Sequence, residues 1–160
     1  MPPEFHPIVH LQQESVFEIT QIGQHNEGHI LSQNDNTQAD ISQSGSSNVG
    51  YIELLYGANS LSRVSQTGTG NRSEVYTYLA NNGQITSTQQ GQGNFGSASL
   101  TDGAYSRATI FQEGEFNSSV TVAQGSFNQA GVIQTGNHNA LQLGQFGIGN
   151  TATVSQGPLH

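Results

Sequence analysis

The sequence predicts an all-β fold, a two-sided β-solenoid whose strand–arc–strand coils of 22–23 residues stack in parallel and in register. Three observations predict it: a motif that recurs at nearly constant spacing, an alternation of inward and outward residues, and a composition poor in apolar side chains. Only 32% of the 160 residues are hydrophobic and 9% are charged, whereas a globular domain has roughly 45–50% apolar residues. Something other than a thick apolar core must therefore hold the chain together.

A motif of the form Q-x-G-x-x-N recurs along the chain. The main series of glutamines ends at Gln156, and its successive members are 22 or 23 residues apart. A fixed period of this length is typical of repeat architectures, so we expect one structural unit copied about six and a half times. A further copy, which begins at Gln145, lies half a period after Gln134. The motif residues are Gln21, Gly23, Asn26, Gln43, Gly45, Asn48, Gln66, Gly68, Asn71, Gln89, Gly91, Asn94, Gln112, Gly114, Asn117, Gln134, Gly136, Asn139, Gln145, Gly147 and Asn150.

Between the motifs, apolar and polar residues alternate with the period of two that is typical of strands with one buried face. Ile19 and Phe17 precede Gln21 at steps of two, and the positions between such residues are mostly Ser or Thr throughout the series. The half-period segments show the same alternation, as at Ile52 and Leu54. Each unit is therefore expected to contain two strands joined by arcs.

A few residues depart from this alternation. Phe111 and Ile133 fall on outward positions, so we expect them on the outer face. The segments containing Leu31 and Val120 are shifted by one residue relative to the inward pattern. A β-bulge at each place would return the branched residues to the interior, and we predict two such bulges. Four aromatic residues are expected in arcs, as lateral contacts or as lids over the arcs: Phe95, Phe116, Phe127 and Phe146.

The motif glutamines share the inward face with the apolar residues that precede them, so they are expected to stack inside the solenoid. A buried amide without a partner costs about 1–3 kcal/mol. In a ladder each amide donates to the amide on the next level, as in cross-β packing, and the cost is avoided. The asparagines are expected to stack in the arcs, where Gly and Asn supply the left-handed backbone angles of tight reversals.

We expect residues 15–156 to form the solenoid, residues 1–14 to form an N-terminal extension that is flexible or weakly caps one end, and residues 157–160 to form a tail. Soluble solenoids normally cover their terminal strands with capping structure. The repeat continues to Gln156 without a capping unit after it, which predicts that copies add head to tail. The first ten residues lack the basic start and apolar middle of a signal peptide, which favours a mature, exported form.

Charge and residue types argue against several functions. The net charge is −8, with three basic residues and no lysine, which disfavours nucleic acid as a partner. The sequence has no run of roughly 18 apolar residues that would insert into a membrane. It also has no cysteine that could form a disulfide. Glu113 and Glu115 are interpreted as solvated charges rather than catalytic carboxylates, and the histidines as surface residues rather than metal ligands. We therefore expect no enzyme, and no catalytic, metal-binding or cofactor-binding residue.

The repeat resembles the curlin repeat, S-x5-Q-x-G-x-x-N-x-A-x3-Q, the building unit of bacterial curli fibres. Ser60, followed by Gln66, Gly68 and Asn71, matches this pattern, and the resemblance spans residues 15–156. It implies a structural subunit of an extracellular functional amyloid that serves biofilm matrix and adhesion. It also implies three kinds of partner: further copies of the chain, a minor nucleator subunit and an outer-membrane export channel. The acidic charge and the regular last repeat resemble the major subunit more than the nucleator.

The family resemblance further implies that Gln and Asn of the terminal repeats drive assembly, while Gly and Asp of inner repeats slow it. Candidate brakes here are Asp35, Asp40 and Asp102. The chain departs from the alanine of the family motif at Gly28, Gly50, Ser73 and Gly96. Two alternatives remain at this point: a minor nucleator curlin, and a soluble ice-binding or carbohydrate-binding solenoid. An ice-binding face would need a Thr-x-Thr array on every level, whereas threonine is scattered in this sequence.

Overall fold

The computed structural model describes residues 15–157, which consist of strands and the turns between them. The predicted extension 1–14 and residues 158–160 of the predicted tail lie outside the described residues. Within the described part, 13 strands form two parallel sheets of seven and six strands. The all-β solenoid fold predicted from the sequence is confirmed. No helix in this part of the chain is long and apolar enough to cross a lipid bilayer.

The odd-numbered strands form the seven-stranded sheet in chain order: β1 (Val16–Gln24), β3 (Gln38–Ser46), β5 (Leu61–Thr69), β7 (Gln84–Gln92), β9 (Arg107–Glu115), β11 (Gln129–Thr135) and β13 (Thr151–Gln156). The even-numbered strands form the six-stranded sheet: β2 (Glu27–Ser32), β4 (Val49–Leu55), β6 (Arg72–Asn81), β8 (Phe95–Ala104), β10 (Ser118–Gln124) and β12 (Ala140–Phe146).

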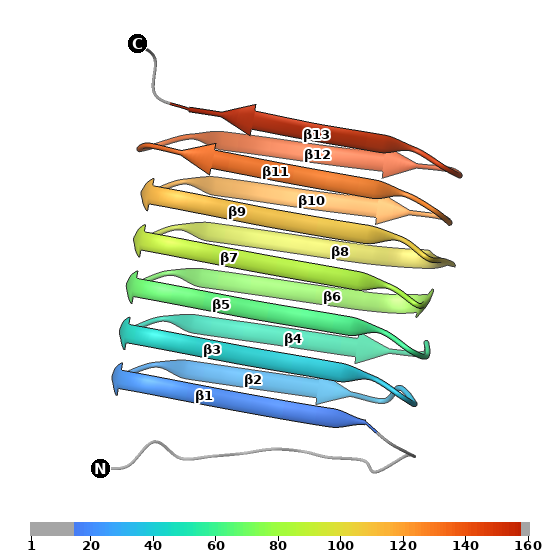
Figure 1. The fold of residues 1–160 in the computed structure, drawn as a ribbon, viewed down its shortest axis with the longest axis horizontal. Coiled ribbons are helices and arrows are strands. Elements are labelled where there is room, and N and C mark those ends of the chain that lie inside the picture. Colours follow the sequence, from blue (N-terminus) through green and yellow to red (C-terminus); the bar gives the residue numbers. More distant parts are fainter. Residues whose placement is uncertain (1–14, 158–160) are drawn as a thin grey trace.

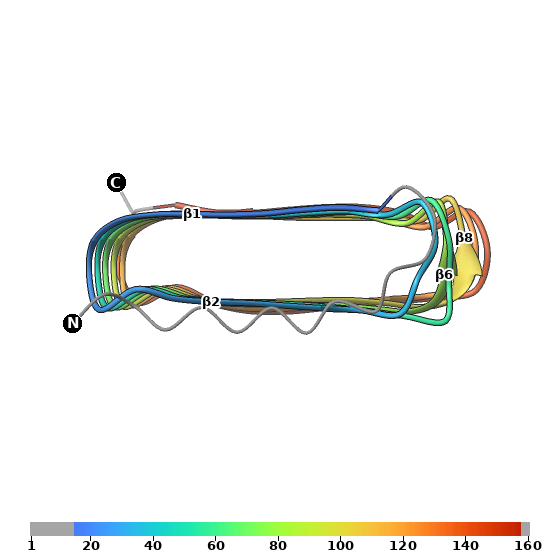
Figure 2. The same ribbon diagram turned by 90° about the horizontal axis from the view of Figure 1, so that it is seen from below.

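The chain winds as a flattened coil because successive strands alternate between the two sheets (Figure 1). Viewed along the coil axis, the two sheets form the long sides of a flattened ring, and the arcs form its two narrow edges (Figure 2). We call the edge formed by the arcs after odd-numbered strands the motif edge, and the other the opposite edge. Equivalent residues pair from level to level, as Ile19 does with Ile41 and Ile41 with Val64. This register places identical motif positions directly above one another.

The space between the sheets is thin and is filled mainly by small and medium side chains. Inward positions alternate with outward ones along β3 and β9, as the period of two predicts. Buried Ser and Thr side chains share this interior with apolar residues. The buried apolar residues are Ala39, Ile41, Ile52, Leu54, Val64, Val75, Ala80, Ile85, Ala98, Leu100, Ala108, Ile110, Ala123, Ala130 and Val132.

The two predicted bulges are absent, and that prediction was wrong. Leu31 pairs with Glu53 in an unbroken ladder between β2 and β4. In β10, Val120 lies on the outer face while Ser119 and Thr121 are buried, even though their hydroxyls have no hydrogen-bond partner. A bulge would leave one residue unpaired against both neighbouring strands. The backbone hydrogen bonds to both neighbouring strands stabilise the fold by more than burying valine would.

The outer face carries the other residues that depart from the alternation. Phe111 and Ile133 pair with each other across β9 and β11 on outward positions, as predicted. Phe95 was predicted in an arc but is the first residue of β8, where it pairs with Arg72. Phe116 and Phe127 lie in arcs with positive φ, and Phe146 ends β12. The error at Phe95 arises because the strand begins one residue after the motif asparagine.

Candidate functional site: the amide ladders

Seven glutamines of the main series form a continuous ladder through the seven-stranded sheet. The Nε2 of each glutamine donates to the Oε1 of the next, over 2.7 Å from Gln21 to Gln43 and 2.8 Å in each later step. Gln43, Gln66, Gln89, Gln112 and Gln134 are at most 1% exposed. Side-chain amides are therefore the largest polar groups of the interior, and each is paired along the coil axis.

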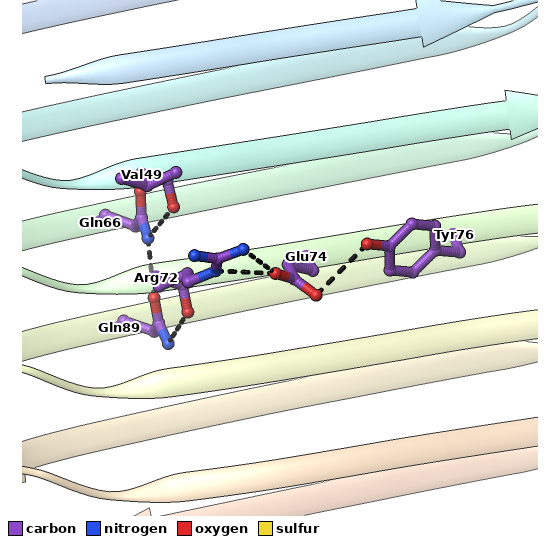
Figure 3. A network of polar contacts seen from close by, with 6 residues as sticks. All are labelled: Val49, Gln66, Arg72, Glu74, Tyr76 and Gln89. Atoms are coloured by element: carbon purple, nitrogen blue, oxygen red, sulfur yellow. Dashed lines mark hydrogen bonds and ion pairs between the residues drawn. The ribbon is translucent and has the colours of Figure 1, made fainter.

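Each glutamine after the first also links the two sheets. Gln66 Nε2 donates to the backbone carbonyl of Val49 at 2.9 Å, and Gln89 Nε2 donates to that of Arg72 at 2.9 Å. The accepting carbonyls belong to the first residues of even-numbered strands. Figure 3 shows both bonds beside the ladder step between Gln66 and Gln89. One amide nitrogen thus satisfies both of its protons, and it joins levels and sheets at once.

A second ladder runs along the motif edge. Asn71 Nδ2 donates to Asn48 Oδ1 at 3.1 Å, and the backbone N–H of Asn71 donates to the same oxygen at 3.1 Å. Asn71 Nδ2 also donates to the carbonyl of Gly91 on the next level at 3.0 Å. Asn26, Asn48, Asn94, Asn117 and Asn139 occupy the same column. Asn71 therefore contacts three successive levels, and so do Asn48 and Asn94.

The motif glycines are required by this contact. Gly45 and Gly68 have φ of 115° and 117°, in the region that disfavours residues with a Cβ atom. A Cβ added at Gly45 would overlap the carbonyl oxygen of Gly68. That oxygen accepts a hydrogen bond from Asn48 Nδ2. The G-x-x-N part of the motif is thus one device, in which the missing side chain lets the next level approach the asparagine.

The glycines at the family's alanine positions face the glutamine ladder. A Cβ added at Gly50 would lie 3.0 Å from Ile41 Cγ2 and 3.3 Å from Gln43 Nε2. Ser73, in the same column, is buried and donates to Ser87 Oγ at 2.8 Å. These small residues leave room for the amides to reach the opposite sheet.

The half-period motif does not join either ladder. Gln145 lies in β12, where it pairs with Ala123, and its Nε2 donates to the carbonyl of Gln129 at 2.9 Å. Its buried Oε1 has no hydrogen-bond partner. Asn150 lies on the opposite edge, where its Nδ2 donates to Asn128 Oδ1 at 3.1 Å. The structure therefore separates Gln145 and Asn150 from the columns of the other motif residues.

Sequence reasoning missed Asn128. It is fully buried on the opposite edge, and its Nδ2 donates to the carbonyl of Gly147 at 2.9 Å. The geometry repeats that of the motif edge with Gly125, whose φ is 100°. The signal was present in the sequence as Gly125 followed three residues later by Asn128. It escaped notice because Ala123 occupies the place of the motif glutamine.

An ionised network lies on the outer face of the six-stranded sheet. Arg72 Nε donates to Glu74 Oε1 at 2.7 Å, and the Tyr76 hydroxyl donates to Glu74 Oε2 at 3.2 Å (Figure 3). The Tyr51 hydroxyl donates to Glu53 at 2.7 Å. Burial, aided by the hydrogen bond to Glu53, raises the pKa of Tyr51 to about 12. Burial and the charge of Glu74 also raise the pKa of Tyr76.

Other titratable groups are dispersed over the surface. His25 and His138 occupy the same arc position on levels far apart. His29 Nε2 lies 2.7 Å from Glu27 Oε1 on the exposed face, and His6 and His10 lie outside the described residues. Within 15–157, no three His, Cys, Asp or Glu side chains gather as metal ligands would. Glu113 and Glu115 sit at the end of β9 on exposed positions.

The repeat unit is similar to a known protein family. Residues 34–68 match the family model described as a curlin associated repeat. No curated protein matches the chain. The matched segment covers β3, β4 and most of β5, including two copies of the glutamine–glycine pair. The same unit is stacked in register through the described strands. The chain therefore contains a curlin associated repeat at residues 34–68.

Proposed function

We propose that this protein is a non-enzymatic structural subunit that assembles head to tail into extracellular amyloid-like fibres for biofilm matrix and adhesion. The observation that carries the proposal is the state of the two ends of the seven-stranded sheet. Among residues 15–157, β1 pairs only with β3 and β13 only with β11. Each end strand therefore offers backbone donors and acceptors to one more parallel strand.

The glutamine ladder gives these ends complementary chemistry. Every step donates in the same direction, from Gln21 toward Gln156. Within the described residues, Gln21 Oε1 accepts no ladder bond and Gln156 Nε2 donates to no further glutamine. Stacking β13 of one copy against β1 of the next would continue the ladder without reversing it. The six-stranded sheet stops at β12, half a coil earlier, so β13 and β1 carry the junction.

The match to a curlin associated repeat supports the proposal of secretion and of two further partners, a nucleator subunit and an outer-membrane export channel. The predicted brakes lie at the surface. Asp40 accepts a hydrogen bond from Arg63 Nε at 3.0 Å on the outer face of the seven-stranded sheet, while Asp35 and Asp102 are exposed on the opposite edge. We propose the role of the major subunit, because the ladder continues without interruption to Gln156.

Assembly is tested with purified protein diluted from denaturant. We expect a lag, then thioflavin-positive fibres, a shorter lag with seeds, and fibre diffraction near the roughly 4.8 Å spacing of hydrogen-bonded strands. A chain that stays monomeric and clear for weeks would refute the proposal. Such a chain would then be assayed for ice or carbohydrate binding, the soluble alternative.

The ladder end is tested with Gln156→Leu, which removes the terminal amide donor. We expect slower elongation from wild-type seeds, with little change in the stability of the unassembled chain because Gln156 lies at the edge of the core. Gln142→Leu is the matched control, since Gln142 is exposed on the outer face of β12. Equal elongation rates for the two variants would show that the ladder end does not guide addition.

A further inference from the structure

Two tyrosines and two carboxylates form a compact square on the outer face of the six-stranded sheet. Tyr51 pairs with Glu74 across β4 and β6, and Glu53 pairs with Tyr76. Each hydroxyl donates to the carboxylate two residues away on its own strand. The two rings lie close together, with centroids 5.7 Å apart and planes inclined by 46°.

This arrangement favours the loss of a hydrogen atom from each phenol. Removing an electron from a phenol makes its hydroxyl proton strongly acidic, and a carboxylate at hydrogen-bond distance can accept that proton. Glu53 and Glu74 are placed to do so. The same two negative charges favour electron loss from the rings between them. Since both phenols are hydrogen-bonded in their neutral form, the proton acceptors are in place before oxidation.

We propose that Tyr51 and Tyr76 form an oxidative cross-linking site. A small one-electron oxidant takes one electron from each ring, and each hydroxyl proton passes to its carboxylate. The two radicals couple through ring carbons next to the hydroxyl-bearing carbons. The hydrogens on those carbons leave as protons while the phenol hydroxyls are restored. With persulfate as the final acceptor, its O–O bond breaks as it takes up the two electrons and becomes two sulfate ions.

The chain contains a built-in comparison. Tyr56 and Tyr78 also bring their rings together, with centroids 5.6 Å apart and planes inclined by 86°. They are more accessible, at 59% and 43% exposed. Within the described residues, however, neither hydroxyl has a side-chain hydrogen bond to a carboxylate. If proximity and exposure alone decided the reaction, this second pair would react first. If proton acceptance decides, Tyr51 and Tyr76 react first.

The bond would join β4 to β6 covalently and would close the chain between residues 51 and 76. It would therefore fix one coil level onto the next through a link that denaturant does not break. Such a staple restricts the unfolded chain in the way that a disulfide does. This chain has no cysteine and so cannot form a disulfide. The tyrosine pair would give it a covalent cross-link of another kind. The inference concerns the folded coil and does not depend on assembly.

The experiment uses a ruthenium photo-oxidant with persulfate on the full chain, freshly folded and dilute, with brief illumination. Trypsin cleavage at Arg63 and Arg72 separates Tyr51 from Tyr76, so the product appears as one cross-linked peptide pair. Fragmentation spectra then assign the linked tyrosines. A mixture of ¹⁵N-labelled and unlabelled chains identifies links between copies. We expect an intramolecular Tyr51–Tyr76 product ahead of any Tyr56–Tyr78 product.

Conservative variants separate the proton acceptors from mere proximity. We expect Tyr51→Phe to abolish the product and Tyr56→Phe to leave it unchanged. The double variant Glu53→Gln, Glu74→Gln keeps the shape of the square but weakens proton acceptance, and we expect the initial yield to fall roughly ten-fold. Far-UV circular dichroism would check that each variant folds. A dominant Tyr56–Tyr78 product, or an unchanged yield in the double variant, would overturn the proposal.

Discussion

Gln89 lies at the centre of the glutamine ladder. Its replacement by leucine measures how much one ladder glutamine contributes to the free energy of unfolding. Gln89 donates to Gln112 Oε1 and to the Arg72 carbonyl, and it accepts from Gln66 Nε2. Leucine has a similar volume, so it leaves little empty space. The loss comes instead from groups that remain buried without their partner.

The magnitude follows from the contacts. In Gln89→Leu, one proton of Gln66 Nε2 keeps its bond to the Val49 carbonyl, but the other loses its acceptor. Gln112 Oε1 loses its donor, and the part-buried carbonyl of Arg72 loses its amide donor. One buried donor and one buried acceptor at about 1–3 kcal/mol each predict that the free energy of unfolding falls by about 2–6 kcal/mol.

Gln145→Leu is the control for this change. Gln145 is equally inward but stands outside the ladder, with one hydrogen bond and a buried oxygen that has no partner. Leucine removes both the bond and the unpaired oxygen, so we expect a change within about 1 kcal/mol. Urea unfolding, followed by circular dichroism at low concentration before polymerisation, measures both variants. Equal destabilisation of the two variants would refute the claim that the ladder stabilises the coil.

Three further outcomes are expected. Gly91→Ala should destabilise the fold by about 2–6 kcal/mol, because its φ of 111° and the neighbouring carbonyl both exclude a Cβ; Gly70→Ala, with open space around it, should cost about 1–2 kcal/mol in the same urea assay. Tyr51 should ionise near pH 12 in a spectrophotometric titration, and because its folded pKa exceeds the unfolded value of about 10, its contribution to stability should be complete below pH 10 and lost by about pH 12; a normal titration would contradict this. Arg63→Gln should change stability by less than about 1 kcal/mol, because its ion pair with Asp40 is solvent-exposed, and a larger loss would show that the pair is structural.

Much of the fold follows from counting along the sequence. The spacing of the glutamines fixes the coil length, and the parity of the residues before them decides which side chains face inward. Ile41, Val64 and Ile110 are buried where this parity places them. Both features are local, since a strand turns successive side chains to opposite faces whatever its neighbours are. The same local pattern explains why Phe111 and Ile133 could be assigned to the outer face.

The sequence pattern misled us where the preference of a residue for the interior conflicts with backbone pairing to the neighbouring strands. Around Val120, the branched residues favour the interior, and local reasoning predicts a bulge. The strands on either side of β10 impose the register instead, because a shift would break backbone hydrogen bonds to both. The result is an outward Val120 and a buried Thr121 with an unpaired hydroxyl. Only the stacked neighbours could decide this outcome.

The sequence by itself determined the period, the inward face and the residue types that can stack. Tertiary structure alone decided the direction in which the amides donate, the separation of Gln145 from the ladder, the role of Asn128, and the meeting of Tyr51 with Tyr76. The physical reason is that each of these contacts joins residues about one coil apart in the chain or crosses between the sheets. Spacing places such residues on neighbouring levels, but the orientation of a side-chain dipole depends on the partner that it finds there.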